Sequence, residues 1–302
     1  TPAVLDRTAP GPPLPNGDGG SLAERPLASR SPNRYETANA PGGDGIEATM
    51  ANYDSYVICT SPRSGSTLLC SLLAATGVAG NPDSHFHRPS IDDWLAEYRI
   101  APAAGASEPE VLGQILQAAI AEGRGDTAIF GLRLQRHSFD YFTGKLAVLF
   151  PERSNDVDRL EAAFGRTLFI HLTRPDKVDQ AVSYVKAQQT GLWHMAPDGT
   201  ELERLSPPRE PVYDGVELKA CFETMTAYDR EWEAWFEEQG IEPLRLSYEG
   251  LSADPIGILR GVLDRLGLDP DIANGVTLGV RKLADATNRD WVQRLRSEIE
   301  TV

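Results

Sequence analysis

Apolar and polar positions alternate along this chain in two ways, and the change from one to the other marks its elements. Four short runs of apolar and β-branched residues predict buried strands at 56–59, 128–134, 167–173 and 243–248. Between them, apolar residues recur three or four positions apart, the spacing of helices that bury one face. Strands that alternate with helices predict an α/β fold, a three-layer sandwich with a central parallel sheet. The helical spacing covers 68–73, 91–98, 111–121, 141–150, 157–164, 178–185, 218–236, 255–266 and 291–295.

The first 49 residues lack this pattern. They are rich in Pro, Gly, Ser and Ala, with stretches such as Pro10–Pro15. A segment of this kind cannot bury enough apolar surface to offset the entropy of ordering it. We therefore predict a disordered tail or linker over 1–49 and a folded domain over 50–302. Met50 stands directly before the first predicted strand, which leaves open whether the upstream residues are native.

A second irregular stretch spans 190–216. It contains Trp193, Pro207, Pro208 and Pro211 and shows no regular period. Long structureless connections in compact domains are uncommon and are usually functional. We predict a flap here that faces a substrate or a partner.

Composition and charge exclude several classes of protein. The formal net charge of −15 argues against sequence-independent nucleic-acid binding, which relies on a basic surface. Cys59, Cys70 and Cys221 lack the spacing of a metal site or a disulfide framework, and predict buried thiols in a reducing compartment. No apolar run approaches the roughly 20 residues that span a bilayer, and no signal peptide is visible. A soluble cytoplasmic protein is the expectation.

The stretch Ser61–Thr67 joins the first predicted strand to the first helix. A short polar loop at such a junction points backbone N–H groups and a helix N-terminus at a phosphate. The loop differs from the G-x-x-x-x-G-K-[ST] motif of nucleotide triphosphatases, because Ser66 replaces the lysine that follows Gly65. The cation comes earlier, at Arg63, and its planar fork suits a phosphate or sulfate group. Taken alone, the loop is equally compatible with an ordinary Gly/Ser turn.

Arg63, Arg133 and Arg174 all lie at or just past the carboxyl ends of predicted strands. Ligands of parallel α/β sheets bind beyond these ends. Ser183 follows Arg174 by nine residues on the next predicted helix, so a guanidinium and a hydroxyl could meet one dianion. The alternative is structural, with Arg174 paired to a carboxylate and Ser183 in a helix contact.

The segment Ser61–Thr67 resembles the 5′-phosphosulfate loop of sulfotransferases that use PAPS (3′-phosphoadenosine 5′-phosphosulfate). More narrowly, it resembles the bacterial trehalose 2-sulfotransferase family, which includes lipopolysaccharide and nodulation-factor sulfotransferase homologues. Arg174–Ser183 matches that family's pattern Arg-Pro-Asp-x-x-x-Gln-Ala-Val-Ser, which holds the 3′-phosphate. The resemblance covers most of 53–298 and implies a P-loop-like sulfotransferase domain. It also implies that PAPS binds, without a metal, through Arg63, Ser64, Gly65, Ser66, Thr67, Arg174, Ser183 and Lys282.

Arg281–Trp291 resembles the closing segment of the family, an Arg-Gln-Ala-Asp run followed by Glu-Trp. Lys282 falls where the family has Arg, and Leu283 falls where it has Gln. The resemblance implies a cation over the nucleotide, from Arg281 or Lys282. A solvated charge pair is the alternative.

The resemblance further implies transfer of a sulfuryl group from PAPS to a carbohydrate or glycolipid hydroxyl, with release of 3′,5′-adenosine bisphosphate. Arg63 and the loop amides would stabilise the charge on the departing phosphate. The family has a Glu as general base where ungapped matching puts Ser84, and serine cannot take this role. His85 is our first candidate for the base, because imidazole has a suitable pKa. His137, at a strand end, is the second candidate, and Asp83 stays open.

Two other functions stay open at this point. A small-molecule kinase of the P-loop type would need a lysine after Gly65 and a carboxylate for Mg²⁺ at a strand end, and neither is apparent. A catalytically inactive module that binds a nucleotide would explain the loss of the family's Glu. The assembly, including a homodimer, and the identity of the acceptor also stay open.

Overall fold

The computed structural model describes residues 52–196, 198–277 and 283–300. They fall within the unit Ala48–Val302. The tail predicted over 1–49, together with Arg281 and Lys282, lies outside the described residues.

Four parallel strands form the central sheet, which confirms the prediction from the sequence. Thr60, the last residue of the first strand, pairs with Gln135 on one side and with Leu172 on the other. This register brings the carboxyl ends of three strands to one edge, so the segments that follow them can meet there. The strands are β1 (Ser55–Thr60), β2 (Phe130–Gln135), β3 (Thr167–Thr173) and β6 (Leu244–Ser247), in the order β2-β1-β3-β6.

Helices follow every strand of this sheet, and the sequence shows helical spacing for each of them except 248–253, which directly follows the last strand. Side chains cap several of them: the Ser90 hydroxyl accepts from the Asp93 amide, and the Asn155 side chain accepts from the Asp158 amide. The helices are α1 (Ser66–Ala75), α2 (Ile91–Tyr98), α3 (Glu108–Arg124), α4 (Arg136–Leu149), α5 (Asp156–Phe164), α6 (Lys177–Thr190), α7 (Gly215–Gln239), α8 (Tyr248–Ala253), α9 (Pro255–Leu266), a 3-10 helix (Pro270–Gly275) and α10 (Ala286–Glu300).

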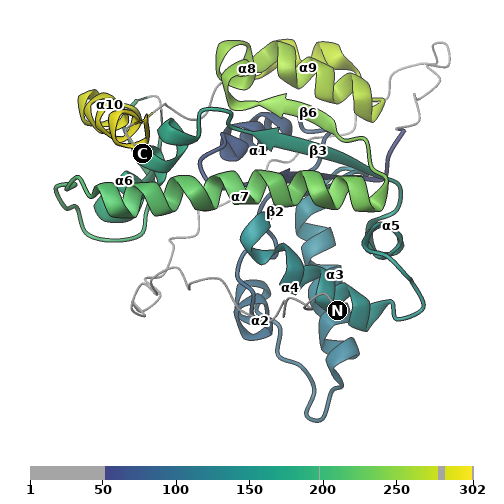
Figure 1. Ribbon diagram of the computed structural model, residues 1–302. Coiled ribbons are helices and arrows are strands. Elements are labelled where there is room, and N and C mark those ends of the chain that lie inside the picture. The colour runs from purple at the N-terminus through teal and green to yellow at the C-terminus, as the bar shows by residue number, and fades with distance from the viewer. Residues whose placement is uncertain (1–51, 197, 278–282, 301–302) are drawn as a thin grey trace, which may run out of the picture. The chain divides into compact units, whose positions relative to one another are not determined.

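Helices cover both faces of the sheet, which confirms the three-layer arrangement (Figure 1). On one face, Val57 and Cys59 of β1 join an apolar cluster with residues of α3, α4, α5 and α7. On the other face, Tyr56 and Ile58 join a cluster with residues of α1, α8 and α9. Alternate residues of β1 therefore face opposite layers, which explains why this strand is apolar throughout.

The long helix α7 runs along one face of the sheet and continues toward α6 and α10 (Figure 1). There a third cluster joins Val182 and Val185 of α6 to Leu218 of α7 and to Trp291 and Leu295 of α10. This packing fixes α6, whose polar residues face the loop after β1.

The stretch 190–216 is more regular than predicted. It contains an antiparallel hairpin of β4 (Leu192–Met195) and β5 (Glu201–Arg204). The pairing is irregular between Leu192 and Met195, so the strands show no simple alternation in the sequence. Arg204 Nη1 donates to the Thr190 carbonyl oxygen at 2.6 Å and holds the hairpin against the end of α6. The expectation of an irregular flap was therefore wrong for these eight residues.

All three cysteines are free thiols, as expected. Burial raises the pKa of the Cys59 thiol, that of Cys70 to about 11 and that of Cys221 to about 12. Within the described ranges, no helix is long and apolar enough to cross a bilayer.

Candidate active site

The loop between β1 and α1 depends on two left-handed backbone positions. Arg63 has a φ of 62° and Gly65 has a φ of 86°, a region that favours glycine. A Cβ atom on Gly65 would also lie 2.8 Å from Cδ2 of Tyr248. Glycine is therefore required at 65, and the turn that it allows leads directly into the first turn of α1 at Ser66.

Partners from two layers hold this loop in position. Gln180 Nε2 in α6 donates to the Pro62 carbonyl oxygen at 2.7 Å and to the Ser61 hydroxyl at 2.9 Å. Trp232 Nε1 in α7 donates to the Thr60 carbonyl oxygen at 2.9 Å. The hydroxyls of Thr60 and Ser64 lie 2.5 Å apart. The loop therefore has a fixed shape before any ligand arrives, which lowers the cost of binding one.

Arg63 contacts Ser183, the residue that the sequence analysis pairs with Arg174 around one dianion. Arg63 Nε donates to Ser183 Oγ at 3.0 Å, and Arg63 Nη1 donates to the Trp193 carbonyl oxygen at 2.8 Å. Burial and the neighbouring Arg174 charge lower the pKa of Arg63 to about 10. The guanidinium therefore stays charged at neutral pH, in surroundings that favour a bound anion.

Arg174 is 7% exposed and approaches the loop from the end of β3. Its guanidinium lies over the ring of Tyr248, 4.3 Å from the centroid, and Nη1 donates to the Arg63 carbonyl oxygen at 3.4 Å. The carboxylate of Asp179 lies 3.6 Å from Nη2, so the structural alternative is present in part. Arg174 Nε, however, has no hydrogen-bond partner among the described residues. This leaves a buried donor for a ligand oxygen.

Arg133 connects α1 to the loop that follows it. From β2, its Nη1 donates to Thr67 Oγ1 at 2.9 Å, Nε donates to Ser84 Oγ at 2.7 Å, and Nη2 donates to Asp83 Oδ1 at 2.9 Å. Ser84, the residue matched to the family's Glu, thus lies one side chain away from the first turn of α1. The sequence indicated Arg133 only by its position in a strand.

His194 is a residue of this site that the sequence analysis missed. It lies in β4, with Nε2 3.2 Å from Thr67 Oγ1 and 3.3 Å from Glu203 Oε2. Burial and the charges of Arg63 and Arg133 lower its pKa to about 4. The β4–β5 hairpin therefore reaches the loop between β1 and α1. In the sequence, the only indication of this was the prediction that 190–216 faces a substrate or a partner.

The ring of His85 packs toward the amino end of the sheet, away from the loop. Its ring is 3% exposed and stacks on Phe130, with the centroids 6.0 Å apart. Phe130 pairs with Ser55, at the amino end of β1, whereas the loop begins after Thr60. Five residues of strand separate these ends, which is roughly 16 Å. Burial lowers the pKa of His85, and its Nε2 has no hydrogen-bond partner among the described residues.

His137 lies at the loop end of the sheet. It is the second residue of α4 and follows Gln135, which pairs with Thr60. Its ring meets the ring of His87 edge to face, with the centroids 5.1 Å apart. Burial and the neighbouring His87 lower the pKa of His137 to about 4. The imidazole is therefore neutral at neutral pH and able to accept a proton.

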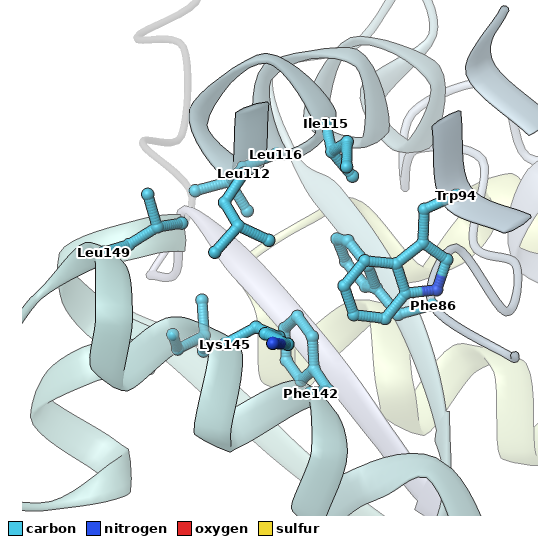
Figure 2. A pocket seen from close by; sticks show the side chains of 9 residues that line it. Phe86, Trp94, Leu112, Ile115, Leu116, Phe142, Lys145 and Leu149 are labelled. Atoms are coloured by element: carbon cyan, nitrogen blue, oxygen red, sulfur yellow. The ribbon is translucent and has the colours of Figure 1, made fainter. Parts of the chain in front are cut away.

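A narrow apolar pocket lies between α2, α3 and α4 (Figure 2). Lys145 is the charged residue of its lining, and its amine pairs with Glu108 Oε1 at 2.8 Å. The pocket therefore belongs to the packing of this helical layer and is not part of the loop site. It is lined by Phe86, Trp94, Leu112, Ile115, Leu116, Phe142, Lys145, Leu146 and Leu149.

Fold and site together define a class of protein. It is a parallel α/β protein whose first loop lacks the P-loop lysine. Three arginines surround this loop instead: Arg133 from β2, Arg63 from the loop itself and Arg174 from the end of β3. Such a site suits a ligand with phosphate or sulfate groups.

Residues 55–298 match the Stf0 sulphotransferase family, and the chain belongs to that family. The match confirms the sulfotransferase predicted from the loop, and it does not favour the kinase or the inactive module.

Two similar proteins carry the name trehalose 2-sulfotransferase. That of Mycobacterium tuberculosis (strain ATCC 35801 / TMC 107 / Erdman) is 31% identical over 265 residues, which is 80% of this chain and 94% of that protein. That of Mycolicibacterium smegmatis is 29% identical over 264 residues, 82% of this chain and 96% of that protein. A solved structure, the sulfotransferase domain from the Synechococcus PCC 7002 olefin synthase, covers 80% of this chain and 94% of its own at 14% identity, with a TM-score of 0.34.

Proposed function

We propose that this sulfotransferase uses PAPS and transfers its sulfuryl group to a hydroxyl of a saccharide or of a glycolipid head group, with release of 3′,5′-adenosine bisphosphate. The observation that carries the proposal is the contact of Arg63 with Ser183, with Arg174 beside them. The charge of the buried Arg174 acts against that of the partly buried Arg63, and a ligand with two separate anionic groups would relieve that repulsion. PAPS is such a ligand.

The two ends of the donor would be held by different segments. Arg63, Ser64, Gly65, Ser66 and Thr67 would bind the 5′-phosphosulfate through side chains and backbone amides. The orphaned Nε of Arg174 and the hydroxyl of Ser183 would bind the 3′-phosphate. Lys282, outside the described residues, would lie over the nucleotide.

The transfer forms a bond between the acceptor oxygen and sulfur, and it breaks the bond between sulfur and the oxygen that bridges to phosphate. The departing phosphate gains negative charge, which Arg63 and the amides of the loop would stabilise. The proton of the acceptor hydroxyl goes to a base. We propose His137 for this role, because it lies at the loop end of β2. A bound anion would raise its pKa from about 4 toward the operating pH.

A saccharide acceptor is supported by the names of the two similar proteins. The resemblance puts Ser84 where the family has a Glu, so saccharides other than trehalose are included in the proposal. We further propose a cytoplasmic location, which the three free thiols support.

Calorimetric titration of 3′,5′-adenosine bisphosphate against ATP tests the donor part of this proposal. We expect clear binding of the bisphosphate and weaker binding of ATP, which lacks a 3′-phosphate. Transfer from ³⁵S-labelled PAPS to trehalose, glucose and maltose then tests the acceptor part. Failure to bind the bisphosphate, or tighter binding of ATP, would overturn the proposed donor.

A further inference from the structure

Gln135 has a place in the site that neither the loop nor the arginines explain. It is the last residue of β2, beside Thr60, and α4 with His137 follows it. Leu132 and Leu134 of the same strand belong to the apolar cluster on the α3–α4 face. Residues alternate along a strand, so Gln135 faces the opposite side, the side on which Arg133 reaches Thr67.

The side-chain oxygen of Gln135 is buried without a hydrogen-bond partner. The residue is 7% exposed, and its Oε1 accepts no hydrogen bond from the described residues. The hydrogen bond from Ser138 Oγ, at 3.2 Å, goes to the backbone carbonyl oxygen and not to the side chain. Buried polar atoms are nearly always paired, and an unpaired one destabilises the fold. Its place at the edge of the candidate active site therefore points to a ligand.

The hydrogen-bonding chemistry of Gln135 Oε1 indicates which kind of ligand group it can bind. An amide oxygen only accepts hydrogen bonds. The oxygens of phosphate and sulfate groups also act only as hydrogen-bond acceptors at neutral pH. The phosphosulfate end of PAPS therefore cannot donate a hydrogen bond to Gln135 Oε1. A hydroxyl of a sugar donates. We propose that Gln135 Oε1 accepts a hydrogen bond from a hydroxyl of the acceptor saccharide and so determines acceptor specificity, an inference that rests on the proposed function.

The first test needs no ligand. In Gln135→Leu, a side chain of similar size removes the unpaired amide, so we expect the melting temperature of the free protein to rise by about 2 °C or more. Gln239→Leu is the matched control. Gln239 Oε1 accepts from the amides of Asp156 and Val157 at 3.2 and 3.3 Å, so this variant should melt lower. A lower melting temperature for Gln135→Leu as well would mean that its amide is satisfied within the protein, and the inference would be overturned.

The second test measures transfer from ³⁵S-labelled PAPS to trehalose, or to the most rapidly sulfated sugar of the panel. Gln135→Leu should raise the KM for the sugar about tenfold or more, since the loss of a buried hydrogen bond leaves a sugar hydroxyl unpaired. Gln135→Glu, which keeps an accepting oxygen, should restore part of this loss. The affinity for 3′,5′-adenosine bisphosphate should stay within twofold in both variants.

The outcomes separate the two levels of the proposal. If the unaltered protein does not bind the bisphosphate, the proposed donor fails, while the melting comparison still decides whether Gln135 is unpaired. If the unaltered protein binds the bisphosphate and transfers sulfate, but Gln135→Leu keeps the KM within twofold, the inference on Gln135 fails and the proposed function stands. A fall in bisphosphate affinity in Gln135→Leu would assign the residue to the donor and would also overturn the inference.

Discussion

On the α6 side of the loop, polar side chains largely have protein partners: Gln180 makes two hydrogen bonds to the loop, and Arg63 donates to Ser183 and to the Trp193 carbonyl oxygen. On the β2 side, the amide oxygen of Gln135 has no partner among the described residues, and the rings of His87 and His137 face each other. The first region is held by hydrogen bonds within the protein. The second has an unpaired buried acceptor, which suits the acceptor site proposed above.

This contrast predicts that changes on the two sides affect different constants. Variants on the α6 side should change donor affinity and the stability of the loop. Variants on the β2 side should change turnover or acceptor KM and leave donor affinity unchanged.

The largest effect, a fall in kcat, is expected for a substitution of His137. His137→Gln keeps the size and polarity of the side chain and removes the base, so kcat should fall by about 10²–10⁴, the usual range for acid–base catalysis. Steady-state transfer of labelled sulfate measures this, and calorimetry should give an unchanged affinity for 3′,5′-adenosine bisphosphate. His85→Leu is the control and should keep kcat within about threefold. The reverse pattern, with His85 essential and His137 dispensable, would return the role of base to His85.

The next effect concerns the arginines of the α6 side. Arg63→Ala and Arg174→Ala should each weaken bisphosphate binding by about 1.5–3 kcal/mol, because each removes a charged donor. Arg245→Ala, which removes an exposed arginine paired with Glu233, serves as the control and should leave the affinity unchanged. Equal affinities in calorimetry for the unaltered protein and these three variants would show that the donor does not bind at this loop.

A smaller effect is expected at Gln180. Gln180→Ala removes two hydrogen bonds to the loop and should lower the free energy of unfolding by about 1–3 kcal/mol. Gln188→Ala loses a single bond to the Tyr184 hydroxyl, at 3.2 Å, and should cost less. Urea denaturation of both variants compares them. If Gln188→Ala costs more, the loop is not held from α6 in the way described.

A last effect is a pH dependence of stability. His194 and His137 have pKa values near 4 in the folded protein, below the value of about 6.5 for an unfolded histidine. The unfolded chain therefore binds more protons between these values, and stability should fall as the pH falls from about 6.5 toward 4. His194→Phe should make this fall less steep. Urea midpoints at several pH values measure the slope, and an unchanged slope would mean that the His194 pKa is not lowered.

Much of the fold could be predicted because its signals are local. β1 and β3 are buried on both faces, so their sequences are almost continuously apolar, and the helices between them show clear spacing. Gly65 is needed for its own backbone angle, and Arg63, Arg133 and Arg174 lie in or after strands whose direction the parallel sheet determines. The parallel direction places these residues at one edge of the sheet, and the strand order seen in the structure makes their strands neighbours.

The direction of individual side chains depended on tertiary packing. His85 lies in a loop whose sequence is compatible with a position near the sulfate, but its ring is held by Phe130, which is distant in the sequence. His194 reaches Thr67 only because the hairpin folds back over α1, and the irregular pairing of β4 with β5 hides that hairpin in the sequence. In the sequence, Gln135 is only a polar residue at a strand end. The structure adds that its side chain is buried. Local patterns therefore determined the sheet and its loop, whereas burial and contacts between distant segments decided which polar groups remain unpaired.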